Sequence, residues 1–304
     1  MKKIIVLLLC LLLTLPAGCA AQDAAQDELI IMTSFYPMYI FCANIAGGVQ
    51  GVSVLNMAAP DTGCLHDYQL LPADMRALEK ADVLVINGAG MESFMDKVLE
   101  QYPDLPVITA SEGIEMLGEA HEHAHEGEDD HEDEDVNAHV WLNPELAAQE
   151  VENIGAALAQ LDGAHAQAYE ANTAAYAQWI RALGEEMRTA LAGVKNRQII
   201  TFHEAFPYFA QAFDLEIVGV IEREPGEEPG TRELAQTCDL VRERGVKALF
   251  AEPQYPNRAA ETIARETGAK VYTLDPIVTG ELDKDAYETK MRENLATLLE
   301  ALGE

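Results

Sequence analysis

Short apolar runs recur along the chain at intervals that leave room for a helix between them. Four such runs lie between residues 29 and 110 (LIIMTSF, VSVLNMA, ADVLVING and LPVITA), and four more follow residue 195 (RQIITF, LEIVGVI, VKALFAE and KVYTL). Runs of this length that alternate with helical patterns are typical of βαβ units with parallel strands. The sequence therefore predicts an α/β fold with two lobes.

A long helical pattern separates the two sets of runs. Residues 144–194 are rich in Ala, Leu, Glu and Gln and contain no proline after the first position. The opening NPE, residues 143–145, provides a capping side chain, a proline whose missing N–H costs nothing, and an acid at the positive end of the helix. A break is expected near Asp162, and the second piece, about residues 165–191, would be roughly 40 Å long. Such a helix suits a strut between two lobes.

The N-terminus has the pattern of an export signal. Lys2 and Lys3 precede an apolar run, residues 4–15, that ends in the small residues PAGCA. The run is too short to span a bilayer as a permanent helix. It resembles a bacterial lipoprotein signal, in which Cys19 becomes the lipidated first residue; a secretory signal without a lipid is the alternative. The predicted division of the chain is a signal peptide (1–18), a tether (19–28), an N-terminal lobe (29–143) with a flexible acidic loop (119–136), a helical region (144–194) and a C-terminal lobe (195–304).

Charge and cysteine content narrow the function classes. With 20 basic and 52 acidic residues, the formal net charge is −32, which argues against nucleic acid as a partner because its phosphates would be repelled. A cationic ligand is the natural complement of this charge, although the acidic residues could serve solubility alone.

Beyond the signal and Cys19, the chain contains Cys42, Cys64 and Cys238. This odd number allows at most one intrachain disulfide, and the sequence leaves the pair open.

Four residues with metal-binding side chains lie at or beyond predicted strand ends. His203 follows RQIITF, Asp275 follows KVYTL, His66 lies in the loop after VSVLNMA, and His139 precedes the Asn143 cap. Because ligands bind beyond the carboxyl ends of parallel strands, these residues are expected to meet between the lobes. Three imidazoles and one carboxylate form a ligand set suited to Zn²⁺, and nitrogen-rich sites favour zinc, nickel or copper over manganese.

From about residue 29 to its end, the chain resembles the metal-binding solute receptors of ABC transporters, specifically the zinc-uptake branch. The matching segments are TSFYPMY, HDYQLLPAD, ADVLVINGAGME, the acidic His-rich insertion, NAHVWLNP, FHEAFPYF, FAEPQ and LDP. The resemblance implies two Rossmann-like α/β lobes joined by a long rigid connecting helix, with the metal in the cleft between them. The family's ligands fall on His66, His139, His203 and Asp275, and His203 replaces the glutamate usual in manganese-preferring relatives. GCLHDYQL departs from the commoner motif by placing Cys64 two residues before His66, which raises the question whether sulfur also approaches the metal.

The stretch HEHAHEGEDDHEDED, residues 121–135, is predicted to be an accessory to this site. Its charge and lack of apolar residues predict a disordered segment that holds cations loosely, and the resembling family carries a flexible His-rich loop here. A solvated acidic loop without a role is the alternative. Glu252 and Gln254 in FAEPQ either orient the metal ligands or form a turn. The accessory histidines are His121, His123, His125 and His131.

The resemblance implies an extracytoplasmic, lipid-anchored monomer that captures Zn²⁺ as cargo. It would deliver the ion to a membrane permease driven by a cytoplasmic ATPase, and the chain itself contains no P-loop motif. Two alternatives remain at this stage. One is a receptor for manganese or another divalent ion, or an adhesin, with the same fold. The other is a secreted zinc hydrolase, although His203-Glu204 is followed by AFPYF and lacks the second histidine of an HExxH motif.

Overall fold

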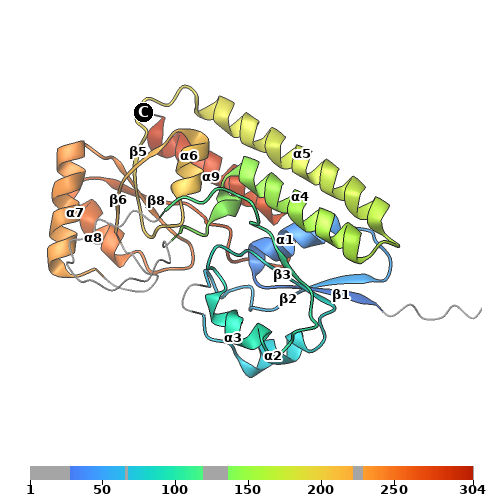
Figure 1. Ribbon diagram of the computed structural model, residues 1–304. Coiled ribbons are helices and arrows are strands. Elements are labelled where there is room, and N and C mark those ends of the chain that lie inside the picture. The colour runs from blue at the N-terminus through green and yellow to red at the C-terminus, as the bar shows by residue number, and fades with distance from the viewer. Residues whose placement is uncertain (1–27, 66–67, 119–135, 222–228, 304) are drawn as a thin grey trace, which may run out of the picture.

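The N-terminal lobe contains a parallel sheet, as the sequence predicts. The computed structural model describes residues 28–65, 68–118, 136–221 and 229–303. The sheet has the order β2-β1-β3-β4, and every neighbouring pair is parallel (Figure 1). Its strands are β1 (Leu29–Thr33), β2 (Val52–Asn56), β3 (Val83–Ile86) and β4 (Val107–Thr109).

The C-terminal lobe repeats the same arrangement. Its sheet has the order β6-β5-β7-β8, again with parallel neighbours throughout. All the apolar runs predicted as strands are strands in the structure, so the prediction of two parallel α/β lobes is confirmed. The strands are β5 (Gln198–Thr201), β6 (Glu216–Val220), β7 (Ala248–Ala251) and β8 (Lys270–Thr273).

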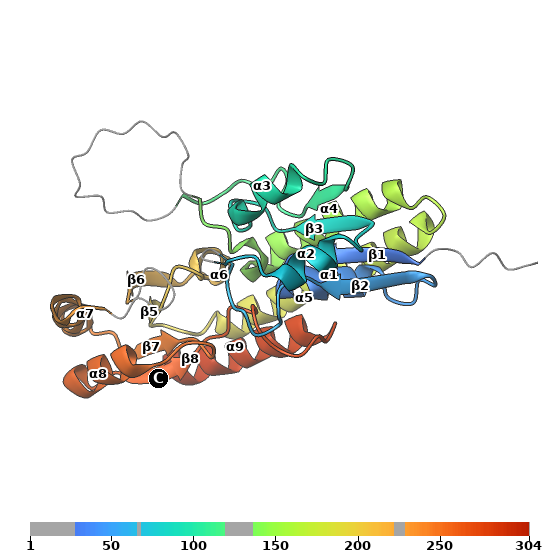
Figure 2. The same cartoon turned by 90° about the horizontal axis from the view of Figure 1, so that it is seen from below.

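Helices connect the strands of each lobe and cover their sheets (Figures 1 and 2). Leu71 and Asn143 precede the prolines that start α2 and α4 and have extended backbones, which helps to fix where these helices begin; α6 also starts at a proline, Pro207. The helices outside the central region are α1 (Tyr36–Ile45), α2 (Pro72–Leu78), α3 (Asp96–Leu99), α6 (Pro207–Phe213), α7 (Thr231–Arg244), α8 (Arg258–Thr267) and α9 (Ala286–Leu302), with short 3-10 turns η1 (Ser93–Met95) and η2 (Val140–Leu142).

The predicted connecting helix is the second of a packed pair, α4 (Pro144–Leu161) and α5 (Ala166–Leu191), which run side by side in Figure 1. The Asn143 side chain accepts a hydrogen bond from the Glu145 N–H at 3.0 Å and so caps α4, as its sequence predicts. The helices approach closely at Gly155, where an added Cβ would lie 1.9 Å from the Thr173 hydroxyl oxygen. The lobes are thus linked by two helices in close contact.

One hydrophobic core continues from lobe to lobe through these helices. It contains Ile31 of β1, Ile199 of β5 and Ile180 of α5, all fully buried. The C-terminal helix α9 returns from the second lobe, and the Tyr287 hydroxyl donates to the Trp141 carbonyl at 2.9 Å. Buried contacts therefore span the junction between the two lobes.

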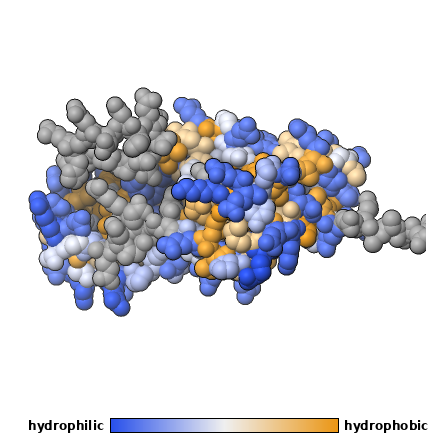
Figure 3. All heavy atoms as spheres, turned by 60° about the horizontal axis from the view of Figure 1, so that its bottom comes forward, coloured by the Kyte–Doolittle hydropathy of each residue, from blue (hydrophilic) through white to orange (hydrophobic). Residues whose placement is uncertain are grey.

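The exposed surface mixes polar and apolar side chains. Figure 3 shows polar residues interspersed with apolar ones across the visible face. The large exposed apolar side chains come from separate elements, such as Leu55 of β2 and Leu299 of α9. No helix within the described ranges combines the length and the apolar character needed to cross a bilayer. The predicted signal peptide, Cys19, nearly all of the predicted tether, His66 and nearly all of the acidic loop lie outside the described residues.

Candidate metal centre

The carboxyl ends of two adjacent strands place His203 and Glu252 next to each other. β5 and β7 are neighbours at the centre of the second sheet, with Thr201 opposite Phe250. His203 lies two residues beyond Thr201, and Glu252 lies two residues beyond Phe250, so both emerge at the same edge. After β5 the chain adds β6 on one side of it and then crosses over to add β7 on the other side. The point between β5 and β7 is therefore the topological switch point, where α/β folds form ligand crevices.

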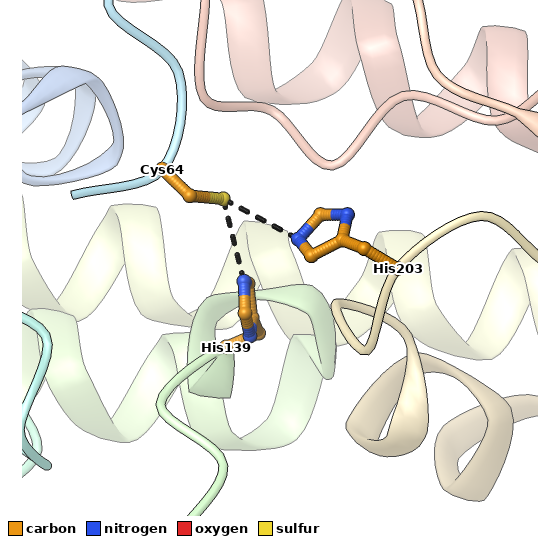
Figure 4. A group of neighbouring side chains, drawn as sticks. All are labelled: Cys64, His139 and His203. Carbon is orange, nitrogen blue, oxygen red and sulfur yellow. Dashed lines mark hydrogen bonds between the residues drawn. The ribbon is translucent and has the colours of Figure 1, made fainter. Parts of the chain in front are cut away.

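Three side chains from distant parts of the chain converge at this edge. The Cys64 Sγ lies 3.4 Å from the His139 Nε2 and 3.6 Å from the His203 Nε2. The three potential ligand atoms all lie within 4.8 Å of one another. Figure 4 shows the thiol directed toward both rings, with Cys64 and His139 contributed by segments of the first lobe and His203 by the second. The arrangement therefore joins the lobes at a point where a metal ion could be held.

The His139 ring is fixed by Asn137. The Asn137 Oδ1 lies 3.2 Å from the His139 Nδ1 and also accepts a hydrogen bond from the His139 main-chain N–H at 3.0 Å. The Asn137 amide nitrogen in turn donates to the Glu204 carbonyl at 2.6 Å, which ties this residue to the second lobe. Only 2% of His139 is exposed. With an acceptor at Nδ1, the proton is held on that nitrogen, and Nε2 presents its lone pair to the centre.

The His203 ring is fixed in the same way by Glu252. The His203 Nδ1 contacts the Glu252 carboxylate, and the Gln254 amide donates to the other carboxylate oxygen at 2.8 Å. Burial opposes a charge on His203, but the negative charge of Glu252 and the hydrogen bond with Cys64 outweigh it and raise the pKa of His203 to about 10. Glu252 thus lies against the His203 ring and Gln254 against Glu252; for both residues the sequence left open a ligand-orienting role or a turn.

The environment of Cys64 favours a neutral thiol. Burial raises the pKa of the Cys64 thiol, the neighbouring His203 lowers it, and the Glu252 charge raises it further. A bound cation would reverse this balance, because it stabilises the thiolate directly.

Asp275 follows β8, as predicted, but its carboxylate is not part of the converging group. One carboxylate oxygen forms an ion pair with Lys290 of α9, and the other accepts a hydrogen bond from the Ile277 N–H at 2.7 Å. The next residue, Pro276, accepts a hydrogen bond at its carbonyl from the Trp141 indole at 2.8 Å. The LDP segment is therefore held close to η2, and Asp275 has Lys290 as its partner.

The other candidate residues with metal-binding side chains lie away from the converging group or outside the described part of the chain. His66 and the histidines of the acidic loop lie outside the described residues. His165 lies 2.7 Å from the Asp162 carboxylate at the start of α5, away from the converging group. The three described cysteines, Cys42, Cys64 and Cys238, are free.

Sequence reasoning missed Asn137 and gave Cys64 only an open question. Both precede a predicted ligand by two residues, in NAH and CLH. A position two residues before a predicted ligand was therefore the available signal. It was insufficient, because outside regular secondary structure this spacing does not show whether the side chain faces the metal site or away from it.

Comparison with known proteins identifies the family of the chain. Residues 31–301 match the family described as "ZnuA: Zinc-uptake complex component A periplasmic". The chain belongs to this family. The high-affinity zinc uptake system protein ZnuA of Bacillus subtilis is 31% identical over 307 residues, which cover 96% of this chain and 95% of that protein. The zinc-binding protein AdcA of Streptococcus pyogenes is 30% identical over 297 residues, which cover 92% of this chain and 57% of AdcA. The chain thus spans little more than half the length of that relative.

The fold is also that of solved relatives. The SBP FpvC of Pseudomonas aeruginosa, determined in complex with a Ni²⁺ ion, superposes with a TM-score of 0.78 at 30% identity. The superposition covers 91% of this chain and 97% of FpvC. The two-lobed architecture is therefore shared across nearly the whole of both chains.

Proposed function

We propose that this protein is an extracytoplasmic receptor that captures Zn²⁺ and delivers it to an ABC-type permease. The observation that carries the proposal is the convergence of the His139 and His203 Nε2 atoms from opposite lobes. Each ring has its Nδ1 held by an oxygen acceptor, so both Nε2 atoms face the centre, and His203, whose pKa is raised, releases its Nε2 proton when the ion binds. A site shared between lobes suits capture and release, because separating the lobes would remove ligands from the ion.

The zinc-uptake and zinc-binding names of the relatives support Zn²⁺ as the cargo. The choice of ion also has a physical basis, because imidazole nitrogen favours borderline cations such as zinc over manganese. The net charge of −32 favours the approach of any divalent cation and does not select among them.

The proposed ligand set is the one expected from the sequence, His66, His139, His203 and Asp275. His139 and His203 have the geometric support described above. For Asp275, ligation requires its carboxylate to turn from Lys290 to the ion. Glu252 and Gln254 are proposed to hold the His203 ring, and His121, His123, His125 and His131 to gather ions near the site.

The partners of the receptor follow from the family. We propose a membrane permease, driven by a cytoplasmic ATPase, as the acceptor of the ion, and a monomer attached to the membrane through lipid on Cys19. The role of the chain in this scheme is binding and transfer of the ion without chemical change.

Matched histidine substitutions test the proposal. His139→Gln and His203→Gln should each weaken Zn²⁺ binding by at least about tenfold, since even loss of a residue that supports a metal ligand costs 10–100-fold. His165→Gln should leave the affinity unchanged, because His165 pairs with Asp162 away from the centre. The measurement is calorimetric titration of metal-free protein against a competing chelator. Equal effects from all three substitutions would refute this site.

A further inference from the structure

The distances from the Cys64 sulfur to the two histidine nitrogens fit a metal ion shared by all three side chains. In a tetrahedral site with Zn–S of about 2.3 Å and Zn–N of about 2.0 Å, the sulfur and nitrogen ligand atoms lie about 3.5 Å apart. The Cys64 Sγ lies 3.4 Å from one Nε2 and 3.6 Å from the other. The two sulfur–nitrogen distances thus match the spacing that zinc imposes on a sulfur and a nitrogen ligand.

The local fold holds Cys64 in this position. Gly63, which precedes it, has a φ of +89°, a left-handed conformation that favours glycine. A Cβ on Gly63 would lie 3.4 Å from the Tyr255 hydroxyl of the second lobe, so the turn passes close to the opposite wall. Leu65, which follows, is fully buried, and its carbonyl accepts a hydrogen bond from the Tyr68 N–H at 3.0 Å. The backbone on both sides of Cys64 is therefore held in place.

We propose that Cys64 is a direct ligand of the captured ion and that its sulfur sets the selectivity of the site. The proposal rests on the metal-receptor function proposed above, and in a four-coordinate site Cys64 takes the place of one member of the predicted three-histidine and carboxylate set. When the ion binds, the Cys64 S–H bond breaks, an Sγ–metal bond forms, and the proton leaves to solvent. No electron is transferred.

A thiolate changes which ions the site retains. Soft sulfur ligands select zinc and softer cations, whereas manganese prefers carboxylate, carbonyl and water oxygen. The site would accordingly hold Zn²⁺ and Cd²⁺ well and discriminate against Mn²⁺ more strongly than imidazole alone. The thiolate would also offset one of the two positive charges of the ion in the space between the lobes.

Absorption spectroscopy with Co²⁺ in place of Zn²⁺ tests direct coordination. Stoichiometric Co²⁺ added to the full chain should produce a near-ultraviolet thiolate-to-metal charge-transfer band, which Zn²⁺ should abolish by displacement. The histidines and acids of residues 121–135 contain no sulfur, so ions bound there cannot produce the band. Cys64→Ser should remove it, whereas Cys238→Ala, a change in the core of the second lobe, should retain it.

Affinities measured on the same proteins test selectivity. Cys64→Ser should weaken Zn²⁺ and Cd²⁺ binding by at least about tenfold and Mn²⁺ binding by less. Circular dichroism checks that the variant folds, and Cys64→Ala serves as a second variant. If neither variant folds, the presence or absence of the charge-transfer band in the wild-type protein still tests whether sulfur binds the metal.

The outcomes separate the two proposals. Tight Zn²⁺ binding without a charge-transfer band would overturn the role of Cys64 and leave the receptor function intact. A band that survives Cys64→Ser would also overturn it. Absence of any tight Zn²⁺ site would overturn both proposals.

Discussion

Glu150 of α4 is fully buried, and neither carboxylate oxygen has a hydrogen-bond partner within the described part of the chain. Burial, followed by the nearby charge of Glu92, raises the pKa of Glu150 well above its ordinary value. Glu92 receives hydrogen bonds from the Ser34 hydroxyl and the Asn87 and Gly88 N–H groups at 2.7–3.0 Å. Burial raises the pKa of Glu92 as well, but these hydrogen bonds oppose the rise, so Glu150 is the one expected to remain protonated.

The raised pKa predicts how stability changes with pH. A proton bound more tightly in the folded state stabilises that state fully below the unfolded pKa of about 4.3, and this stabilisation is lost as pH rises toward the folded pKa. Within that window the loss is about 1.4 kcal/mol per pH unit. Glu150→Gln removes the titration but retains the shape. Relative to the wild type, the free energy of unfolding of the variant should therefore rise by about 1.4 kcal/mol per pH unit between about pH 4.3 and the folded pKa of Glu150.

Urea unfolding of both proteins at pH 5, 6 and 7, with a chelator present, measures this slope. The chelator is needed because bound metal would add its own pH-dependent stability. Any constant cost of burying the side-chain amide of the variant is an offset and leaves the slope unaffected. Glu152→Gln on the same helix is the control, because Arg181 lowers the pKa of Glu152 and the trend should be small and opposite in sign. Parallel curves for wild type and Glu150→Gln would refute the reasoning.

Two further predictions concern Asp275 and the helix pair. Asp275→Asn should weaken Zn²⁺ binding in chelator competition if its carboxylate turns to the ion, whereas Lys290→Met should not. An effect of Asp275→Asn on the melting temperature alone would assign Asp275 to the Lys290 ion pair only. Gly155→Ala should destabilise the protein by about 1–3 kcal/mol, because the added methyl meets the Thr173 hydroxyl at 1.9 Å. Gly193→Ala, where nothing lies within 4 Å, is the matched control in the same thermal melts, and an equal effect of both would contradict this account.

Local pattern was sufficient to predict the elements of this fold. The β-prone runs became the parallel strands, and the NPE opening capped α4 through Asn143, because strand and cap preferences act over a few residues. The same reasoning identified His203 and Glu252 at strand ends. The sequence also sets the charge of −32, and with it the preference for a cationic ligand.

The composition of the site was decided by tertiary structure. Cys64 reaches His139 across 75 positions and His203 across 139, and no local periodicity encodes such contacts. The ion pair that occupies Asp275 depends on where α9 packs after it returns between the lobes. Side-chain type and spacing thus determine which groups could bind a metal. Which of them share one space depends on strand order and lobe packing, because those determine which distant segments come into contact.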